Sequence, residues 1–321
     1  MSLLAAGYTG PAELTAASAL TTWSFDPVAA ALVLLLAWAY TRGVRRLRAQ
    51  GQPWPVGRSV WFGLGLLALV VESMSFLGAY AHTLLWVTAA QMALLLTVIP
   101  VLLVLGGPVS LLTRAAPSTE PRVEQVLASA PTRVLTFPLI GSILVATVPF
   151  LVYFTPWFEA SLRHLPVYWS LHLVLLTVGL LFFWPVLSID REPRIHYVAL
   201  TVIVLAETLF DAVPGIALWL GTTPIAGDYY REVARPWGRS MLSDQQFGGV
   251  VLWGIGELVG LPLLMIVVVQ WMRSDARDAA RIDRELDAAD AADAADAAEA
   301  EAQRDRAVER DYQGIERKGE E

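Results

Sequence analysis

The sequence contains no cysteine, and only four of its 321 residues are histidine. Without cysteine, the chain cannot form a disulfide, an iron–sulfur cluster or a thiolate metal site. Any site for a soft metal ion must therefore be built from methionine and histidine. Lysine is scarce as well, because Lys318 is the single lysine among 23 basic residues.

Common catalytic motifs are also missing. The sequence has no Walker-type phosphate loop, no Gly-x-Ser-x-Gly and no His-Glu-x-x-His. We therefore expect a protein that is not an enzyme, and we expect no nucleic-acid partner.

Apolar residues, in contrast, are abundant. They make up 55% of the chain, the mean hydropathy is +0.52 and there are 12 tryptophans. This is more apolar surface than one soluble core buries. A membrane-spanning helix needs about 20 mostly apolar residues. The sequence offers seven such stretches, at 24–41, 60–81, 84–105, 134–154, 166–188, 196–220 and 247–271. The predicted fold is an all-α bundle of seven transmembrane helices in contact with the lipid bilayer.

Arginine placement predicts the orientation of these spans. Ten arginines flank the spans on one side of the bundle: Arg42, Arg45, Arg46, Arg48, Arg58, Arg114, Arg122, Arg133, Arg191 and Arg194. The other side has only Arg163, Arg231, Arg235 and Arg239. Because basic residues near span ends stay in the cytoplasm, we expect the N-terminus outside, the C-terminus inside and a multi-pass plasma-membrane protein.

Two tails frame the predicted transmembrane domain, 23–272. Residues 1–22 contain no Lys or Arg, so they lack the basic start of a secretory signal, and we interpret them as a short external tail. Residues 273–321 are rich in Ala, Asp, Glu and Arg. Acids at every third position spiral around a helix and leave no apolar face. A solvated cytoplasmic tail explains this composition, and a docking tail for a basic partner is the alternative.

Four carboxylates fall inside the predicted spans: Glu72, Glu207, Asp211 and Glu257. Glu207 and Asp211 are four residues apart and share a helix face. Ionisable groups at membrane depth are costly and mark candidate functional sites. The alternative is that they are protonated and bonded to backbone or Trp donors in a structural role.

The seventh span begins with a polar cluster and continues as a glycine-rich helix. Ser243 and Gln246 have the spacing of a capping box, which competes with a ligand-binding role for this cluster. Gly249, Trp253, Gly256 and Gly260 share one face, where small residues allow helices to approach closely. Glu257 is expected to point into the bundle beside this face.

Histidine and methionine residues gather near one predicted membrane surface. His82, His172, Met92 and Asp244 are candidate copper ligands there, with Gln245 beside them. A lone interfacial histidine is more often solvated or hydrogen-bonded, and no His-x-x-His pair is present.

Several segments resemble one known family. They are WSFDP at 23–27, YAH at 80–82, PVLLVLGGP at 100–108, the stretch around His172 and above all DQQFGGVVLW at 244–253. In this order they resemble the seven-span CtaG family of cytochrome c oxidase assembly factors. The resemblance implies a membrane factor that works with cytochrome c oxidase subunits and assists copper insertion.

The third span departs from the family pattern. The family's His-Met-x-x-His motif falls on Thr88 to Met92, so both histidines are replaced. The position of the usual methionine before Trp253 is held by Leu252. An assembly role is thus a stronger inference than a copper site. The alternative hypothesis is a proton- or cation-coupled transporter that uses Glu72, Glu207, Asp211 and Glu257 as a relay.

Overall fold

The computed structural model describes residues 8–119, 121, 125, 128–187 and 196–319. These residues form helices joined by loops, and none of them forms a strand. The chain divides into two compact units, 1–267 and 268–321. Arg122, Arg191 and Arg194, used above to predict orientation, lie outside the described residues, as does the start of the predicted external tail at 1–7.

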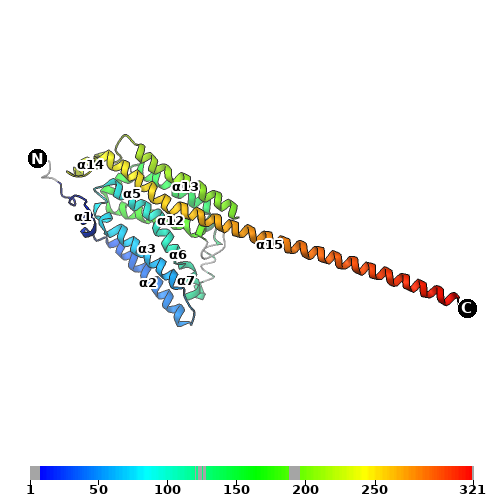
Figure 1. Cartoon of the computed structure of the whole chain (residues 1–321). Helices are drawn as coiled ribbons and strands as arrows, with labels where there is room; N and C mark the ends of the chain where they lie inside the picture. Colours follow the sequence, from blue (N-terminus) through cyan, green and yellow to red (C-terminus); the bar gives the residue numbers. More distant parts are fainter. Residues whose placement is uncertain (1–7, 120, 122–124, 126–127, 188–195, 320–321) are drawn as a thin grey trace. The chain divides into compact units, whose positions relative to one another are not determined.

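The first unit is a bundle of long helices joined by shorter ones (Figure 1). Its first half contains α1 (Ala16–Thr21), α2 (Pro27–Ala49), α3 (Val56–Met74), α4 (Phe76–Tyr80), α5 (Leu85–Ala93), the π-helix η2 (Leu94–Val98), α6 (Ile99–Leu105), α7 (Pro108–Ala115) and the 3-10 turn η3 (Pro117–Thr119). Its second half contains α9 (Ala130–Leu135), α10 (Pro138–Tyr153), α11 (Trp157–Arg163), α12 (Leu165–Leu187), α13 (Tyr197–Leu220), α14 (Gly227–Val233) and the start of α15 (Met241–Gly319).

Among the described residues, six helices are long and apolar enough to cross a membrane, or up to seven if a bent pair counts as one span. The bent pair is α10 with α11, at an angle of 66°. The predicted all-α membrane bundle is confirmed, and the seven predicted stretches agree with the upper count. Two predicted spans are built from consecutive helical segments: 60–81 from α3 and α4, and 84–105 from α5, η2 and α6. In the structure the second of these continues through α7 to Ala115.

The helix α2 begins where the sequence WSFDP ends. Asp26 caps it by accepting hydrogen bonds from the amides of Val28 and Ala29, and Pro27 occupies the first turn, where no amide is needed. The helix continues to Ala49, past the end of the predicted span at residue 41. Arg42, Arg45, Arg46 and Arg48 are therefore helical and extend from the end of a membrane helix.

The third span is irregular because of Pro100. Proline has no amide to donate to the carbonyl of Leu96, and a π-helical turn, Leu94–Val98, precedes it. A Cβ at Gly179 of α12 would collide with the Leu96 carbonyl oxygen and with the Pro100 ring. Glycine at 179 thus lets α12 pack against this break, and α12 also packs on α6 and α10.

The start of α15 differs from the predicted capping box. The helix begins at Met241, and the Ser240 hydroxyl accepts from the Ser243 amide. Ser243 therefore lies inside the first turn and does not cap it, while the Gln246 side chain donates to the Gly221 carbonyl. The capping-box prediction was wrong by three residues because Ser240 offers an equivalent hydroxyl one turn earlier.

The second unit, 268–321, is the rest of α15 up to Gly319. From residue 275 on, every side chain that the structure describes is exposed. This agrees with the alanine and acid pattern, which favours a helix but provides no apolar face to bury.

Candidate functional site

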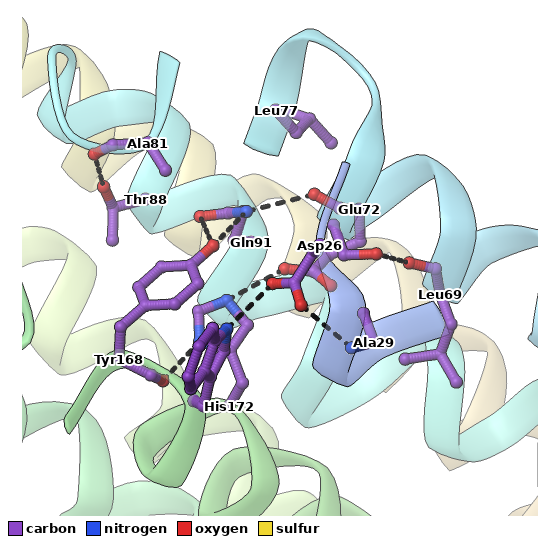
Figure 2. A network of polar contacts seen from close by, with 12 residues as sticks. Asp26, Ala29, Leu69, Glu72, Leu77, Ala81, Thr88, Gln91, Tyr168 and His172 are labelled. Atoms are coloured by element: carbon purple, nitrogen blue, oxygen red, sulfur yellow. Dashed lines mark hydrogen bonds and ion pairs between the residues drawn. The ribbon is translucent and has the colours of Figure 1, made fainter. Parts of the chain in front are cut away.

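A buried imidazole–carboxylate pair links α3 to α12. The Nε2 atom of His172 lies 3.1 Å from Oε1 of Glu72, and the Glu72 side chain is only 1% exposed. The other ring nitrogen, Nδ1, lies 2.9 Å from the backbone carbonyl oxygen of Tyr168, one turn earlier in α12. Figure 2 shows the two side chains facing each other between the helices.

These contacts fix where the protons lie. A carbonyl oxygen only accepts, so Nδ1 of His172 must carry a proton and donate it to Tyr168. If neither Nε2 nor Oε1 were protonated, a nitrogen lone pair would face a carboxylate oxygen in a buried place. The pair therefore holds one proton, as imidazolium with carboxylate or as imidazole with carboxylic acid.

Gln91 of α5 connects the pair to Tyr168. Its Nε2 donates to the Glu72 carbonyl at 3.0 Å and to the Tyr168 hydroxyl at 3.1 Å (Figure 2). Gln91 is 1% exposed and lies fully inside the bundle. Buried amides need such partners, since an unsatisfied donor costs about 1–3 kcal/mol. The three helices α3, α5 and α12 are thus tied together at one polar layer.

Asp26 and Trp169 extend this layer to α2. The Trp169 indole donates to Oδ2 of Asp26 at 3.1 Å, while Oδ1 of Asp26 caps α2. The carboxylate therefore holds the start of one helix against the face of another. We name this layer, formed by Asp26, Glu72, Gln91, Tyr168, Trp169 and His172, the buried polar layer.

His82 borders the layer from the loop between α4 and α5. Its ring centroid lies 5.1 Å from that of Tyr168, which in turn lies 4.0 Å from that of His172. Burial lowers the pKa of His82, a backbone hydrogen bond with Leu162 opposes this, and the nearby His172 lowers it further. The expected convergence of His82 and His172 is observed, with Tyr168 between the two rings.

The family motif positions, in contrast, serve packing. The Thr88 hydroxyl donates to the Ala81 carbonyl at 2.8 Å, and Met92 is 1% exposed within the hydrophobic core of the bundle. Thr88 thus ties the start of α5 to the residue that ends α4, and Met92 fills the hydrophobic core.

Asp244 lies in a separate cluster at the start of α15. Its Oδ2 accepts from the Leu85 amide at 2.7 Å, and its Oδ1 lies 3.8 Å from the Arg235 guanidinium. The carboxylate thus caps the first turn of α5, where backbone amides favour a negative charge. The Trp86 amide and Arg239 also interact with this carboxylate, and none of the interactions given for it is with His82 or His172.

Gln245 anchors the loop that follows α13. Its Oε1 accepts from the Ile225 amide at 2.7 Å, and its Nε2 donates to the carbonyls of Thr223 and Leu218 at 3.3 and 3.4 Å. The side chain is 1% exposed. The run Asp244 to Gln246 therefore acts as a set of three side-chain anchors for backbone groups of neighbouring segments.

The remaining intramembrane carboxylates gather where α13 meets α15. Glu207 is buried and interacts electrostatically with Asp211 and Glu257. The Asp211 carboxylate packs directly on the Cα of Gly256, and Glu257 accepts from the Trp253 indole at 3.1 Å. The proximity of Glu207 and Asp211 agrees with the sequence pattern, whereas Glu257, expected to point into the bundle, is only partly buried and bonds to the exposed Trp253. Glu72 lies elsewhere, with His172.

The described residues contain no group of three or more His, Asp or Glu side chains placed to hold a metal ion. The sequence reasoning missed Gln91, Tyr168 and Arg235. Gln91 is the one amide in the stretch 84–105, and a lone amide at that depth needs a buried partner. Tyr168 is one turn before His172, the distance at which helical side chains meet.

Three related proteins match most of this chain. They are the "Uncharacterized protein Mb0105" of Mycobacterium bovis and "Uncharacterized protein MT0111" of Mycobacterium tuberculosis, each 36% identical over 291 residues, and "Uncharacterized protein ML1998" of Mycobacterium leprae, 35% identical over 291 residues. Each match covers 88% of this chain but only 44% of the relative. The chain thus spans less than half the length of these curated relatives.

No solved structure matches the chain. A family model described as "Cytochrome c oxidase caa3 assembly factor (Caa3_CtaG)" matches residues 38–274. The matched region holds all of the candidate site except Asp26. The chain belongs to the cytochrome c oxidase caa3 assembly factor family.

Proposed function

We propose that this protein assists the maturation of a haem–copper cytochrome c oxidase as a multi-pass protein of the plasma membrane. The observation that carries the proposal is the family match, which covers 38–274 and thus nearly all the membrane helices. The proposed orientation, with the N-terminus outside, rests on the arginines of 42–58, 114 and 133.

The protein acts in this proposal by binding an oxidase subunit and not by catalysis. The buried polar layer ties α2, α3, α5 and α12 into one rigid unit, because its contacts join α3 to α5, α3 to α12, α5 to α12 and α2 to α12. A rigid bundle presents a fixed surface to a client membrane protein, which lowers the ordering cost of binding.

Copper would be a cargo in this scheme and not a resident cofactor. The Nδ1 proton of His172 is donated to a carbonyl, which leaves Nε2 as the atom that would meet a metal ion. Glu72 adds one oxygen, whereas Met92 is buried in the core and Asp244 caps α5. We infer that any transferred Cu(I) takes one nitrogen from His172 and the remaining soft ligands from the client.

The test is complementation of a strain in which the gene is deleted. Membranes are assayed for oxidase activity and for the haem a spectrum, at ample and at limiting copper. Wild type restores both, and His172→Ala does not. Thr177→Val is the matched control, because Thr177 lies on the same helix, is exposed and bonds only to its own helix. Full oxidase in the deletion strain at limiting copper would contradict the proposal.

Copper handling has its own measurement. Purified protein is loaded with Cu(I) under reducing conditions, and bound copper per chain is compared among wild type, His172→Ala and Met92→Ala. The cargo scheme predicts weak binding that His172→Ala removes and Met92→Ala leaves intact. Tight binding that requires Met92 would instead indicate a resident site in the core.

A second candidate, a proton- or cation-coupled transporter, is favoured by one observation. Three carboxylates, Glu207, Asp211 and Glu257, interact at the α13–α15 contact. In liposomes holding the purified chain, transport would appear as a dissipation of an imposed pH gradient that Glu207→Gln abolishes. The assembly proposal predicts no such flux above that of empty liposomes.

A further inference from the structure

A cleft in the membrane-facing surface lies between α2, α3, α7 and α12. It has a volume of 570 Å³, within the range of about 300–1,000 Å³ that is usual for ligand sites. Its walls are almost entirely apolar and include Leu32, Leu36, Leu173 and Leu180. A chain of hydrocarbon is the ligand that such walls accept without loss of hydrogen bonds.

The floor of the cleft is rigid. The rings of Tyr40 and Phe62 stack with centroids 3.9 Å apart, and both residues are buried. The Tyr40 hydroxyl donates to the Gly106 carbonyl at 3.0 Å and accepts from the Trp54 indole at 3.0 Å. Because these polar atoms are satisfied among themselves, the floor offers a fixed apolar surface to the cleft.

One end of the cleft is basic. Arg42 and Arg46 line it, and both also line an adjoining hollow together with Trp38, Thr41 and Arg45. Arg42, Arg45 and Arg46 lie on one helix, α2, within five consecutive residues. The hollow thus continues the apolar cleft into a cationic pocket.

These cations have no acidic partner in the part of the chain that the structure describes. Among the described residues, no carboxylate lies within ion-pair distance of Arg42, Arg45 or Arg46, and the contact recorded for Arg42 is with the Trp38 ring. Three arginines at other places in the bundle do have acidic partners: Arg163 with Glu159 and Glu232, Arg231 with Asp228, and Arg235 with Asp244. The charge at the mouth of the cleft is therefore left for a ligand to balance.

We propose that this cleft binds one anionic phospholipid. An acyl chain lies along the apolar walls, and the headgroup phosphate sits between Arg42 and Arg46. Guanidinium groups bind phosphate oxygens through paired hydrogen bonds, and each basic residue near an anionic membrane surface contributes about 1 kcal/mol. A zwitterionic lipid fits the walls equally well but adds no net negative charge at the mouth.

A lipid suits this place better than a helix of another protein. A helix is roughly 10 Å wide with its side chains and would cover the apolar walls while leaving the arginines unpaired. The lipid satisfies both parts of the site with one molecule. The inference requires only that the chain sits in a membrane and does not depend on oxidase assembly.

The test uses the full chain, purified in detergent and stripped of lipid. It is titrated with phosphatidylglycerol or with phosphatidylcholine of the same acyl chains, and retained lipid is counted by native mass spectrometry. We expect one phosphatidylglycerol per chain to be held preferentially. Arg42→Gln with Arg46→Gln should weaken its binding roughly tenfold or more and leave phosphatidylcholine unchanged.

Two further variants separate the parts of the site. Arg48→Gln is the control, because Arg48 is exposed on the same helix but lines neither hollow, and it should behave as wild type. Ala39→Trp fills the cleft from an exposed position and should reduce both lipids alike. Equal retention of the two lipids by wild type, or equal effects of the Arg42/Arg46 and Arg48 changes, would overturn the proposal. Loss of a co-purified oxidase subunit in Ala39→Trp without any lipid preference would assign the cleft to a protein partner instead.

Discussion

His172 and Glu72 meet through two buried atoms, Nε2 and Oε1, that have no other hydrogen-bond partner among the described residues. The His172 ring cannot turn away, because its Nδ1 is held by the Tyr168 carbonyl. The two residues are 100 positions apart in the sequence and come from α3 and α12. Among the described residues, Nε2 of His172 and Oε1 of Glu72 are therefore each other's only polar partner in the buried polar layer.

The first prediction concerns this pair. Glu72→Leu leaves the imidazole buried without a partner and should lower the free energy of unfolding by about 1–3 kcal/mol. Glu72→Gln should cost less, since the amide can still donate to Nε2. The measurement is thermal unfolding of the purified protein in detergent.

A double-mutant cycle with His172→Leu tests whether the two effects share one cause. The coupling should be of the same size as the single loss, because removing both partners leaves no orphan. Additive losses would show that the two side chains stabilise the bundle independently.

The second prediction concerns the close contact of α13 and α15. A Cβ at Gly249 would collide with the Gly215 carbonyl oxygen, whereas a Cβ at Gly254 meets nothing within 4 Å. Gly249→Ala should therefore destabilise the protein. Gly254→Ala, five residues further along the helix, should be neutral or stabilising by up to about 1 kcal/mol, because alanine favours a helix. The two variants are compared by their melting temperatures, and equal behaviour would argue against tight packing at Gly249.

The sequence predicted this face, since spacings of four, three and four place Gly249, Trp253, Gly256 and Gly260 on one side of a helix. Membrane spans were predictable for the same reason, because their length and hydropathy are local properties. The ends of the helices were harder to predict than the spans. Arg42 to Arg48 do not fit a membrane span, yet α2 continues through them because helix propensity and not hydropathy sets its end.

The partners of polar residues could not be predicted. Asp244 contacts the Leu85 amide 159 positions away, and Trp169 contacts Asp26 143 positions away. Such pairs depend on how helices pack in three dimensions, and one sequence carries no signal for them. His172 and Glu72 were each singled out as unusual at membrane depth, but nothing in their spacing indicated that they meet.

The third prediction concerns Asp244. Asp244→Ala removes the acceptor for the Leu85 amide and the partner of Arg235, so a loss of about 1–3 kcal/mol in the free energy of unfolding is expected. Asp244→Asn should retain the amide contact, because an amide oxygen accepts like a carboxylate. Ser243→Ala is the neighbouring control, because the Ser243 side chain is exposed and its bond to the Ser240 hydroxyl is made by the backbone amide. If Asp244→Ala left stability unchanged while oxidase assembly failed, Asp244 would have a role in binding and not in capping.

The last prediction is a dependence of stability on pH through His82. Burial lowers the pKa of this histidine in the folded protein, below the value of about 6.5 expected in the unfolded chain. Between these two values the unfolded state binds more protons, so its population grows as the pH falls. The stability that neutral His82 permits is therefore present above about pH 6.5 and is lost progressively below it.

His82→Gln should flatten this loss, because glutamine does not titrate. Melting temperatures of wild type and variant are compared between about pH 7.5 and pH 5.5, where the difference is expected to grow in favour of the variant. His164→Gln is the control at an exposed histidine and should follow wild type. Parallel curves for wild type and His82→Gln would mean that His82 is as free to protonate in the folded bundle as in the unfolded chain, and that the ring lies open to water beside Tyr168.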